Sequence, residues 1–275
     1  MLLQRIISAV VALVIVLLVL FVFPTWVVLP VVGVIVALAA WEWGGLIGEG
    51  NTIARITYIV GIALACLGYF ATQYFQFWAP EIFAGILMMA GAWWVFAFAH
   101  LRRYPSKLPA WMVVVGGFLT LVPFFMALDS LARYPNMPRF GGNALLLFVL
   151  VTIWATDVGG YFAGRFLGRR KLLPNVSPNK TWEGVYGGLI LAALIGFCGS
   201  LLLALPWYRV VPLCIITGAV SIVGDLLVSM FKREAGVKDS SNLFPGHGGI
   251  LDRLDSLSAG APLFVAGIAI GHGPW

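Results

Sequence analysis

Residues 184–205 read GVYGGLILAALIGFCGSLLLAL, a run without a single charged side chain. An α-helix of about 20 apolar residues crosses the hydrocarbon core of a bilayer, so this run predicts a membrane-spanning helix. Eight other apolar runs of similar length lie before and after it along the chain. The nine predicted spans are residues 5–23, 25–47, 53–73, 77–100, 111–132, 143–164, 184–205, 208–231 and 251–271.

The composition of the 275 residues supports the same conclusion. Hydrophobic residues make up 61% of the chain, charged residues only 10%, and the mean hydropathy is +0.98. Soluble domains are about 45–50% apolar and about 25% charged, and disordered chains are less hydrophobic still. Membrane barrels show alternating segments of about ten residues rather than continuous runs. We therefore expect an all-α polytopic integral membrane protein with about nine transmembrane helices, the first of which is retained rather than cleaved as a signal peptide.

The basic residues predict how the chain is oriented in the membrane. With the N-terminus in the cytoplasm, 14 of the 17 Lys and Arg residues fall on the cytoplasmic side of the nine spans. Such an excess is the signal that orients helical membrane proteins. This orientation places the two longest polar loops, residues 165–183 and 232–250, on the cytoplasmic face.

The acidic residues predict which part of the chain carries chemistry. Residues 1–150 contain four Asp and Glu side chains, whereas the remaining 125 residues contain seven. We therefore expect residues 1–140 to form a transmembrane scaffold. Residues 141–275 are expected to form a catalytic transmembrane region with cytoplasmic loops 165–183 and 232–250.

The most polar segment of the C-terminal part is GDLLVSMFKREAGVKDSSNLFPGHGGILDRLDS, residues 224–256. Asp225, Ser229 and Lys232 are spaced to share one face of a helix, and so are Asp252 and Asp255. An antiparallel pair of helices would bring Asp225 near Asp252, where the two carboxylates would repel each other unless a cation lay between them. Because no Cys or His cluster is present, we expect a hard cation that prefers oxygen ligands, best Mg²⁺.

The loop within this segment predicts phosphate binding. Lys232, Arg233 and Lys238 carry positive charge, and the glycine-rich run at 245–249 leads into the last helix, whose N-terminus favours anions. These features together indicate phosphoryl or nucleotidyl chemistry, which depends on positioning and charge stabilisation. Each feature alone has a simpler interpretation: His247 as an ordinary loop residue, Gly248 and Gly249 as a turn, and the basic residues as topology anchors.

A second polar stretch begins at Asp157 and Tyr161, which are spaced i, i+4, and continues to Arg165. It is followed by SPNKTWEG, residues 177–184, a basic segment with hydroxyl side chains. The pattern suits either a phosphate-binding cradle or a plain cytoplasmic anchor, and spacing alone does not decide between them.

Three motifs resemble those of the CDP-diacylglycerol synthase family, also called phosphatidate cytidylyltransferases. They are SMFKREAGVKDSSNLFPGHGGILDRLD at 229–255, SPNKTWEG at 177–184 and DVGGYFAGR at 157–165. The resemblance covers about residues 150–265. It implies a nine-span dimeric enzyme of the bacterial inner membrane, with its active site facing the cytoplasm. Such an enzyme would use Mg²⁺, and a second cation, to join CTP and phosphatidic acid into CDP-diacylglycerol and pyrophosphate.

The resemblance also assigns roles to single residues. Asp225 and Asp252 would hold the metal, with Asp255 as a further ligand or as a partner that orients Arg253. The remaining catalytic residues would be Lys232, Arg233 and Lys238, which neutralise phosphate charge. The substrate-binding residues would be Ser177, Lys180, Thr181, Ser229, His247, Gly248, Gly249 and Arg253.

Other functions fit a charged membrane protein. A transporter of an anionic solute would also contain buried charges and glycine-broken helices, although inverted halves are not visible in this sequence. A CTP-dependent lipid kinase would transfer the γ-phosphate to a lipid alcohol. A purely structural membrane subunit fits poorly with the density of charge between residues 225 and 255.

Overall fold

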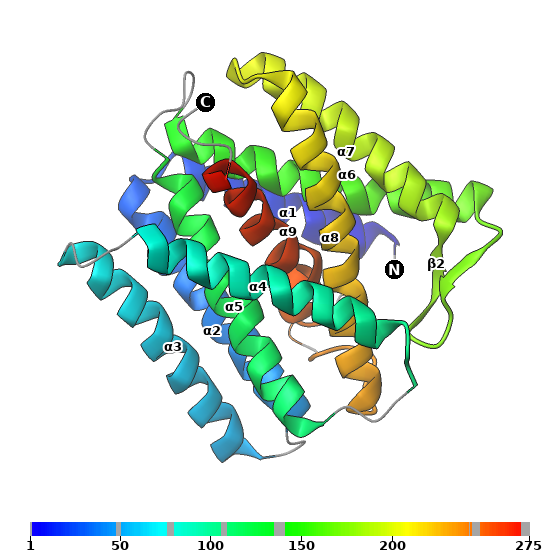
Figure 1. Cartoon of the computed structure of the whole chain (residues 1–275), viewed down its shortest axis with the longest axis horizontal. Coiled ribbons are helices and arrows are strands. Elements are labelled where there is room, and N and C mark those ends of the chain that lie inside the picture. The colour runs from blue at the N-terminus through cyan, green and yellow to red at the C-terminus, as the bar shows by residue number, and fades with distance from the viewer. Residues whose placement is uncertain are drawn as a thin grey trace.

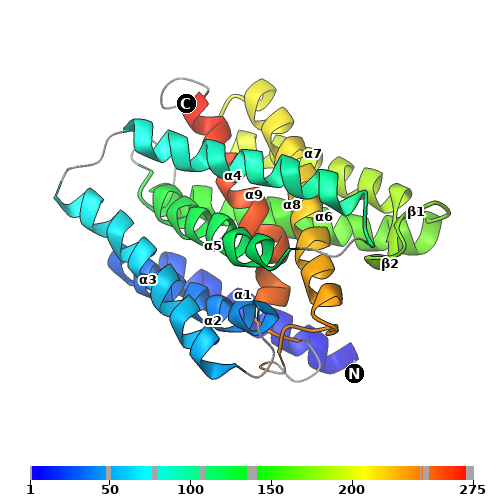
Figure 2. The ribbon, with the colours of Figure 1, turned by 60° about the horizontal axis from the view of Figure 1, so that its bottom comes forward.

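A computed structural model describes residues 2–47, 51–75, 80–105, 109–134, 141–241, 243 and 248–270. Long helices dominate these residues and form a layered bundle (Figures 1 and 2). They are α1 (Leu2–Phe21), α2 (Val28–Ile47), α3 (Thr52–Tyr74), α4 (Pro80–Leu101), α5 (Ala110–Ala132), α6 (Gly141–Leu167), α7 (Trp182–Leu203), α8 (Trp207–Glu234) and α9 (Leu251–Ile270).

These helices confirm the predicted class, an all-α polytopic membrane protein. Within the described ranges, eight helices, α2 to α9, are long and apolar enough to cross a membrane. The first predicted span coincides with α1, whose side chains are described from Val10 to Phe21. Pro24 separates the first two spans as expected, because α1 ends at Phe21 and a short 3₁₀ helix, Thr25–Val27, precedes α2.

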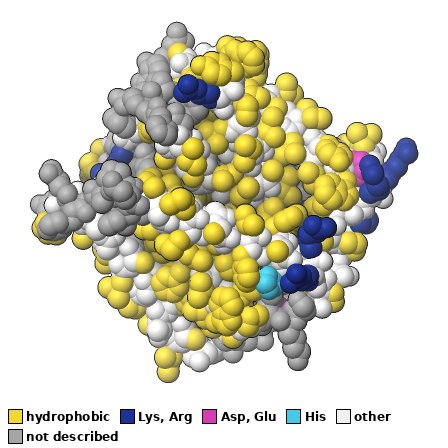
Figure 3. Space-filling model, viewed as in Figure 1, with side chains coloured by type: hydrophobic (Ala, Val, Ile, Leu, Met, Phe, Trp, Pro, Cys, Tyr) yellow, Lys and Arg dark blue, Asp and Glu magenta, His cyan; other side chains and the backbone are white. Residues whose placement is uncertain are grey.

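The surface suits a lipid environment. Large apolar side chains point outward along the helices, among them Val34 and Ile190, which are 61% and 62% exposed. Figure 3 shows one face of the molecule that is mostly hydrophobic. An apolar exterior of this extent is expected where hydrocarbon rather than water surrounds the helices.

The loop at 165–183 contains a feature that the sequence analysis did not predict. Strands β1 (Lys171–Leu173) and β2 (Ser177–Thr181) form an antiparallel hairpin in which Lys171 is opposite Thr181. The Thr181 hydroxyl accepts a hydrogen bond from the Gly184 amide and caps α7. The hairpin therefore leads directly into a helix, which fixes where Lys180 lies.

Small residues allow the helices around the hairpin to approach closely. A Cβ on Gly187 of α7 would overlap Ala163 of α6, and α6 and α7 lie side by side (Figure 1). A Cβ on Gly224 of α8 would lie 2.5 Å from Ala259 Cβ and 2.6 Å from the Asp255 carbonyl of α9. Close packing at small residues is typical of membrane helices. It brings Asp225, the residue after Gly224, next to α9.

The N-terminal helices share one core with the C-terminal ones. Trp43 of α2 donates a hydrogen bond to the Val113 carbonyl of α5, with an N–O distance of 2.8 Å. The ring of Phe231 in α8 packs 5.6 Å from Trp43 and 6.5 Å from Trp93 of α4. The division into scaffold and catalytic region stays a prediction, but helices of the predicted scaffold pack against the C-terminal part of α8.

Candidate active site

The hairpin and α8 meet at an ion pair. The Lys180 ammonium, near the end of β2, contacts the Asp225 carboxylate of α8, and the side chains are 26% and 23% exposed. Ser229, one turn further along α8, donates a hydrogen bond to Asp225 at 3.4 Å, as the i, i+4 spacing predicts. Lys180, predicted to bind substrate, and Asp225, predicted to bind the metal, therefore lie together.

Two more carboxylates belong to the same cluster. Asp255 of α9 lies within hydrogen-bonding reach of Asp225, and the charges of Asp157 in α6, Asp225 and Asp255 act on one another. Ser256 links them, because its amide donates to Asp255 at 2.8 Å and its hydroxyl donates to Asp157 at 3.3 Å. Asp157 is exposed whereas Asp225 and Asp255 are half-buried, so the cluster opens to the surface. Like charges this close need a cation, and Lys180 supplies one.

A second ion pair lies beside the first. The ammonium of Lys232 in α8 lies 2.5 Å from Asp252 Oδ1 in α9, and these side chains are only 8% and 10% exposed. The other oxygen, Oδ2, accepts hydrogen bonds from the Ser240 amide at 2.9 Å, the Ser240 hydroxyl at 3.0 Å and the Gly249 amide at 2.8 Å. The charge of Lys232 also acts on Asp225 and Asp255, so the two pairs form one charged site.

The two predicted metal ligands have different partners in the structure. Asp225 has Asp157 and Asp255 as acidic neighbours, whereas Asp252 is paired with Lys232. The reason is the packing of Gly224 against α9, which aligns Asp225 with Asp255 one turn further into that helix. The antiparallel pairing of α8 and α9 itself was predicted and is present.

The start of α9 also differs from the expectation of a free anion-binding helix terminus. Glu42, from α2, is only 4% exposed and accepts hydrogen bonds from the amides of Ile250 at 3.0 Å and Leu251 at 2.8 Å. The Gly249 amide is bound to Asp252. These three backbone donors are therefore occupied by carboxylates of the chain and do not bind a phosphate in this arrangement.

Sequence reasoning missed Glu42 because it assigned the N-terminal spans to a scaffold. The signal was nevertheless present, since a carboxylate in the middle of an apolar run is costly and is rarely without a function. Asp157 was noted in a motif but was not placed in the site.

The remaining predicted residues lie on, or next to, the elements that carry the charged site. Thr181 is buried at the α7 cap, Ser177 is half-buried at the start of β2, and Lys238 and Arg253 are exposed. Arg233 donates to the Val237 carbonyl at 3.2 Å and closes the end of α8. Gly248 has a φ of +77°, and a Cβ there would lie 2.5 Å from Asp252, so a larger residue would disturb that carboxylate. His247 lies outside the described residues.

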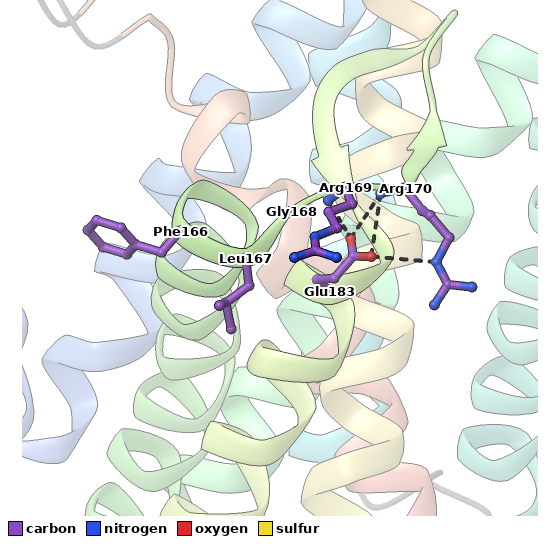
Figure 4. Close-up of a pocket in the computed structure, with 6 residues that line it drawn as sticks. All are labelled: Phe166, Leu167, Gly168, Arg169, Arg170 and Glu183. Carbon is purple, nitrogen blue, oxygen red and sulfur yellow. Dashed lines mark hydrogen bonds and ion pairs between the residues drawn. The ribbon is translucent and has the colours of Figure 1, made fainter.

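An open pocket of about 580 Å³ lies where α6 ends and the hairpin begins (Figure 4). Its lining combines apolar and charged residues: Phe166, Leu167, Gly168, Arg169, Arg170 and Glu183. Glu183 accepts hydrogen bonds from the amides of Arg169 and Arg170, and the Arg170 guanidinium lies 3.5 Å from it. The carboxylate therefore holds the base of the hairpin against α7.

The acidic residues offer only oxygen atoms as ligands, which is the type of ligand that a magnesium ion prefers. Among the residues that the structure describes, however, no three His, Cys, Asp or Glu side chains are grouped closely enough to enclose a metal ion. Lysine ammonium groups compensate the carboxylates instead.

The fold is that of a polytopic membrane protein. Its carboxylates and lysines gather where α6, α8 and α9 meet the hairpin, and such a charged site suits phosphate-bearing substrates. The family model of the cytidylyltransferase family matches residues 3–270, and the chain belongs to this family. A phosphatidate cytidylyltransferase from Pseudomonas aeruginosa is 39% identical over 248 residues, 86% of this chain and 85% of the relative. One from Haemophilus influenzae is 38% identical over 283 aligned positions, 96% of this chain and 97% of the relative. One from Bacillus subtilis is 42% identical over 145 residues, about half of each chain.

Proposed function

We propose that this chain is a phosphatidate cytidylyltransferase, which converts CTP and phosphatidic acid into CDP-diacylglycerol and pyrophosphate in phospholipid biosynthesis. Its similarity to relatives of that name extends over nearly the whole chain. The observation that carries the proposal is the charged site, in which Lys180 and Lys232 lie among the carboxylates of three helices. Charged side chains within transmembrane helices are costly and usually mark functional sites.

In this reaction an ionised oxygen of the lipid phosphate attacks the α-phosphorus of CTP. The new phosphorus–oxygen bond forms as the bond to the β-phosphate bridging oxygen breaks, and the electron pair leaves with pyrophosphate. Lys180 and Lys232 would stabilise the negative charge of the phosphates, and the exposed Lys238 and Arg253 would attract them. Covalent attachment to the enzyme is not required.

We propose Mg²⁺, and a second cation, as cofactors. A bound divalent ion would neutralise phosphate charge and orient the leaving group. Asp225 and Asp252 are the proposed ligands, and Asp255 joins them because it lies beside Asp225. Asp252 would have to give up its contact with Lys232 in order to bind an ion.

We further propose on which side of the membrane the charged site lies, and that two copies of the chain assemble. The predicted orientation would place the site at the cytoplasmic face of a bacterial inner membrane. There phosphatidic acid stays in the bilayer with its phosphate at the interface, and CTP arrives from the cytoplasm. We also propose a homodimer, by resemblance to the family.

Product analysis tests this function. Purified protein supplied with phosphatidic acid, Mg²⁺ and CTP labelled at the α-phosphate should place the label in a lipid. A lipid kinase would instead leave the label in CDP and phosphorylate a lipid alcohol. Uptake of a solute by vesicles without CTP would support a transporter, and either result would overturn the proposal.

A further inference from the structure

We infer that Glu42 is a positioning residue for the active site, acting across the boundary between the N-terminal helices and the catalytic region. This inference rests on the proposed function. It concerns a residue of α2 that the sequence analysis placed in the scaffold.

Four donors converge on the Glu42 carboxylate. They are the hydroxyls of Ser240 at 2.7 Å and Ser241 at 2.6 Å, and the amides of Ile250 and Leu251 at 3.0 and 2.8 Å. Each carboxylate oxygen receives one hydroxyl and one amide. This set of donors matches an ionised carboxylate, which is an acceptor only. Placed at the first turn of α9, its charge is also favoured by the helix dipole.

Ser240 connects Glu42 to the charged site. Its hydroxyl lies 2.7 Å from Glu42 Oε2 and 3.0 Å from Asp252 Oδ2, and its amide donates to the same Asp252 oxygen. A hydroxyl has one proton, so it donates fully to only one carboxylate at a time. Both carboxylates thus hold Ser240, and Asp252 in turn holds Lys232 at 2.5 Å.

The surroundings leave little freedom to this arrangement. A Cβ on Gly249 would collide with both Glu42 oxygens, so the chain passes directly over the carboxylate. Glu42 is 4% exposed, and loss of its charge would leave buried hydroxyls and amides without an acceptor. Glu42 therefore fixes the position of Ser240–Ser241 and of the first residues of α9. Through these residues it also fixes the position of the Lys232–Asp252 pair.

The test combines kinetics and hydrogen exchange on the full-length protein in lipid nanodiscs. Glu42→Gln keeps the size of the side chain but presents an NH₂ group where two donors point. It should lower kcat about 10- to 100-fold, the usual effect of losing a partner that orients a functional side chain, with a smaller change in the KM for CTP. Deuterium uptake should rise in peptides that contain Ser240–Ser241 and Ile250–Asp252.

Two further variants separate positioning from general destabilisation. Ser240→Ala removes only the hydroxyl that connects Glu42 to Asp252. Its effect on kcat should not add to that of Glu42→Gln, because both variants break the same chain of hydrogen bonds. Asp129→Asn is the matched control. It also alters a buried carboxylate, which accepts from Tyr69 at 2.9 Å and Arg133 at 2.6 Å within the N-terminal helices, and kcat should be unchanged.

A kcat for Glu42→Gln within about twofold of wild type, an equal loss in Asp129→Asn, or fully multiplicative effects with Ser240→Ala would each overturn the inference. If the wild-type protein forms no CDP-lipid, the proposed function fails, and the exchange measurement still decides whether Glu42 holds this segment. Unchanged uptake in Glu42→Gln would then refute the inference by itself.

Discussion

Lys180 of the β-hairpin and Asp225 of α8 form an ion pair that connects the 165–183 loop to the charged site. The two residues are 45 positions apart in the sequence, and all of α7 and the first part of α8 separate them along the chain. The pair explains why SPNKTWEG and the segment around Asp225 belong to one site: the hairpin carries Lys180 to the acids of α6, α8 and α9.

Lys180→Ala is expected to weaken substrate use, because it removes the positive charge nearest to Asp225. We expect kcat/KM for CTP or phosphatidic acid to fall by at least about tenfold, measured by steady-state kinetics. Lys171→Ala is the matched control, since Lys171 is exposed on the neighbouring strand of the same hairpin. Equal kinetics in both variants would mean that the hairpin is only an anchor.

The two ion pairs should differ in their contribution to stability. Lys232→Met removes one partner of a pair whose side chains are 8% and 10% exposed, and it should lower the free energy of unfolding by about 3–5 kcal/mol. Lys180→Ala breaks a more open pair and should lower it by about 1 kcal/mol or less. Denaturant titration in detergent measures both. A smaller loss in Lys232→Met than in Lys180→Ala would contradict the burial observed here.

Removal of divalent cations should stop the reaction. EDTA is expected to abolish product formation, and Mg²⁺ should restore it. Asp225→Asn, Asp252→Asn and Asp255→Asn should each raise the Mg²⁺ concentration for half-maximal residual activity, by about 10- to 100-fold for a lost ligand. An unchanged Mg²⁺ requirement in Asp252→Asn would mean that Asp252 is not a metal ligand and serves only to hold Lys232.

The predicted orientation can be measured by labelling of single cysteines. In a background with Cys66, Cys198 and Cys214 replaced by Ala, Lys238→Cys should react with an impermeant maleimide only in inverted membrane vesicles. Trp207→Cys, at the first residue of α8, should react only in right-side-out vesicles. The opposite pattern would place the charged site outside the cytoplasm.

The helices were predictable because a bilayer allows few solutions. A spanning segment must satisfy its backbone hydrogen bonds internally, so an apolar run of about 20 residues is necessarily helical. The hairpin at Lys171–Thr181 was not predicted, because its strands are short and β2 is polar and contains Pro178, which is unusual in a strand. Its formation depends on Glu183 and Thr181, which secure its base on α7.

The site was predictable where it depends on spacing within one helix. The Ser229–Asp225 contact follows from i, i+4 geometry. The antiparallel pairing of α8 and α9 was also predicted, but the ion pair between Lys232 and Asp252 was not. Contacts between distant elements could not be derived in this way. The choice of Asp255 rather than Asp252 as the neighbour of Asp225 depends on how far Gly224 lets α8 slide along α9, and Glu42 reaches α9 only through tertiary packing.

We propose that the carboxylates of α8 and α9 support CTP-dependent nucleotidyl transfer to a lipid phosphate. The most direct measurement is pyrophosphate release by purified wild-type protein and Asp225→Asn, side by side, with CTP, Mg²⁺ and phosphatidic acid. We predict release by the wild type that requires phosphatidic acid, and a loss of about 10²–10³-fold or more in a variant that still inserts into the membrane normally. Release by Asp225→Asn at the wild-type rate would contradict this account.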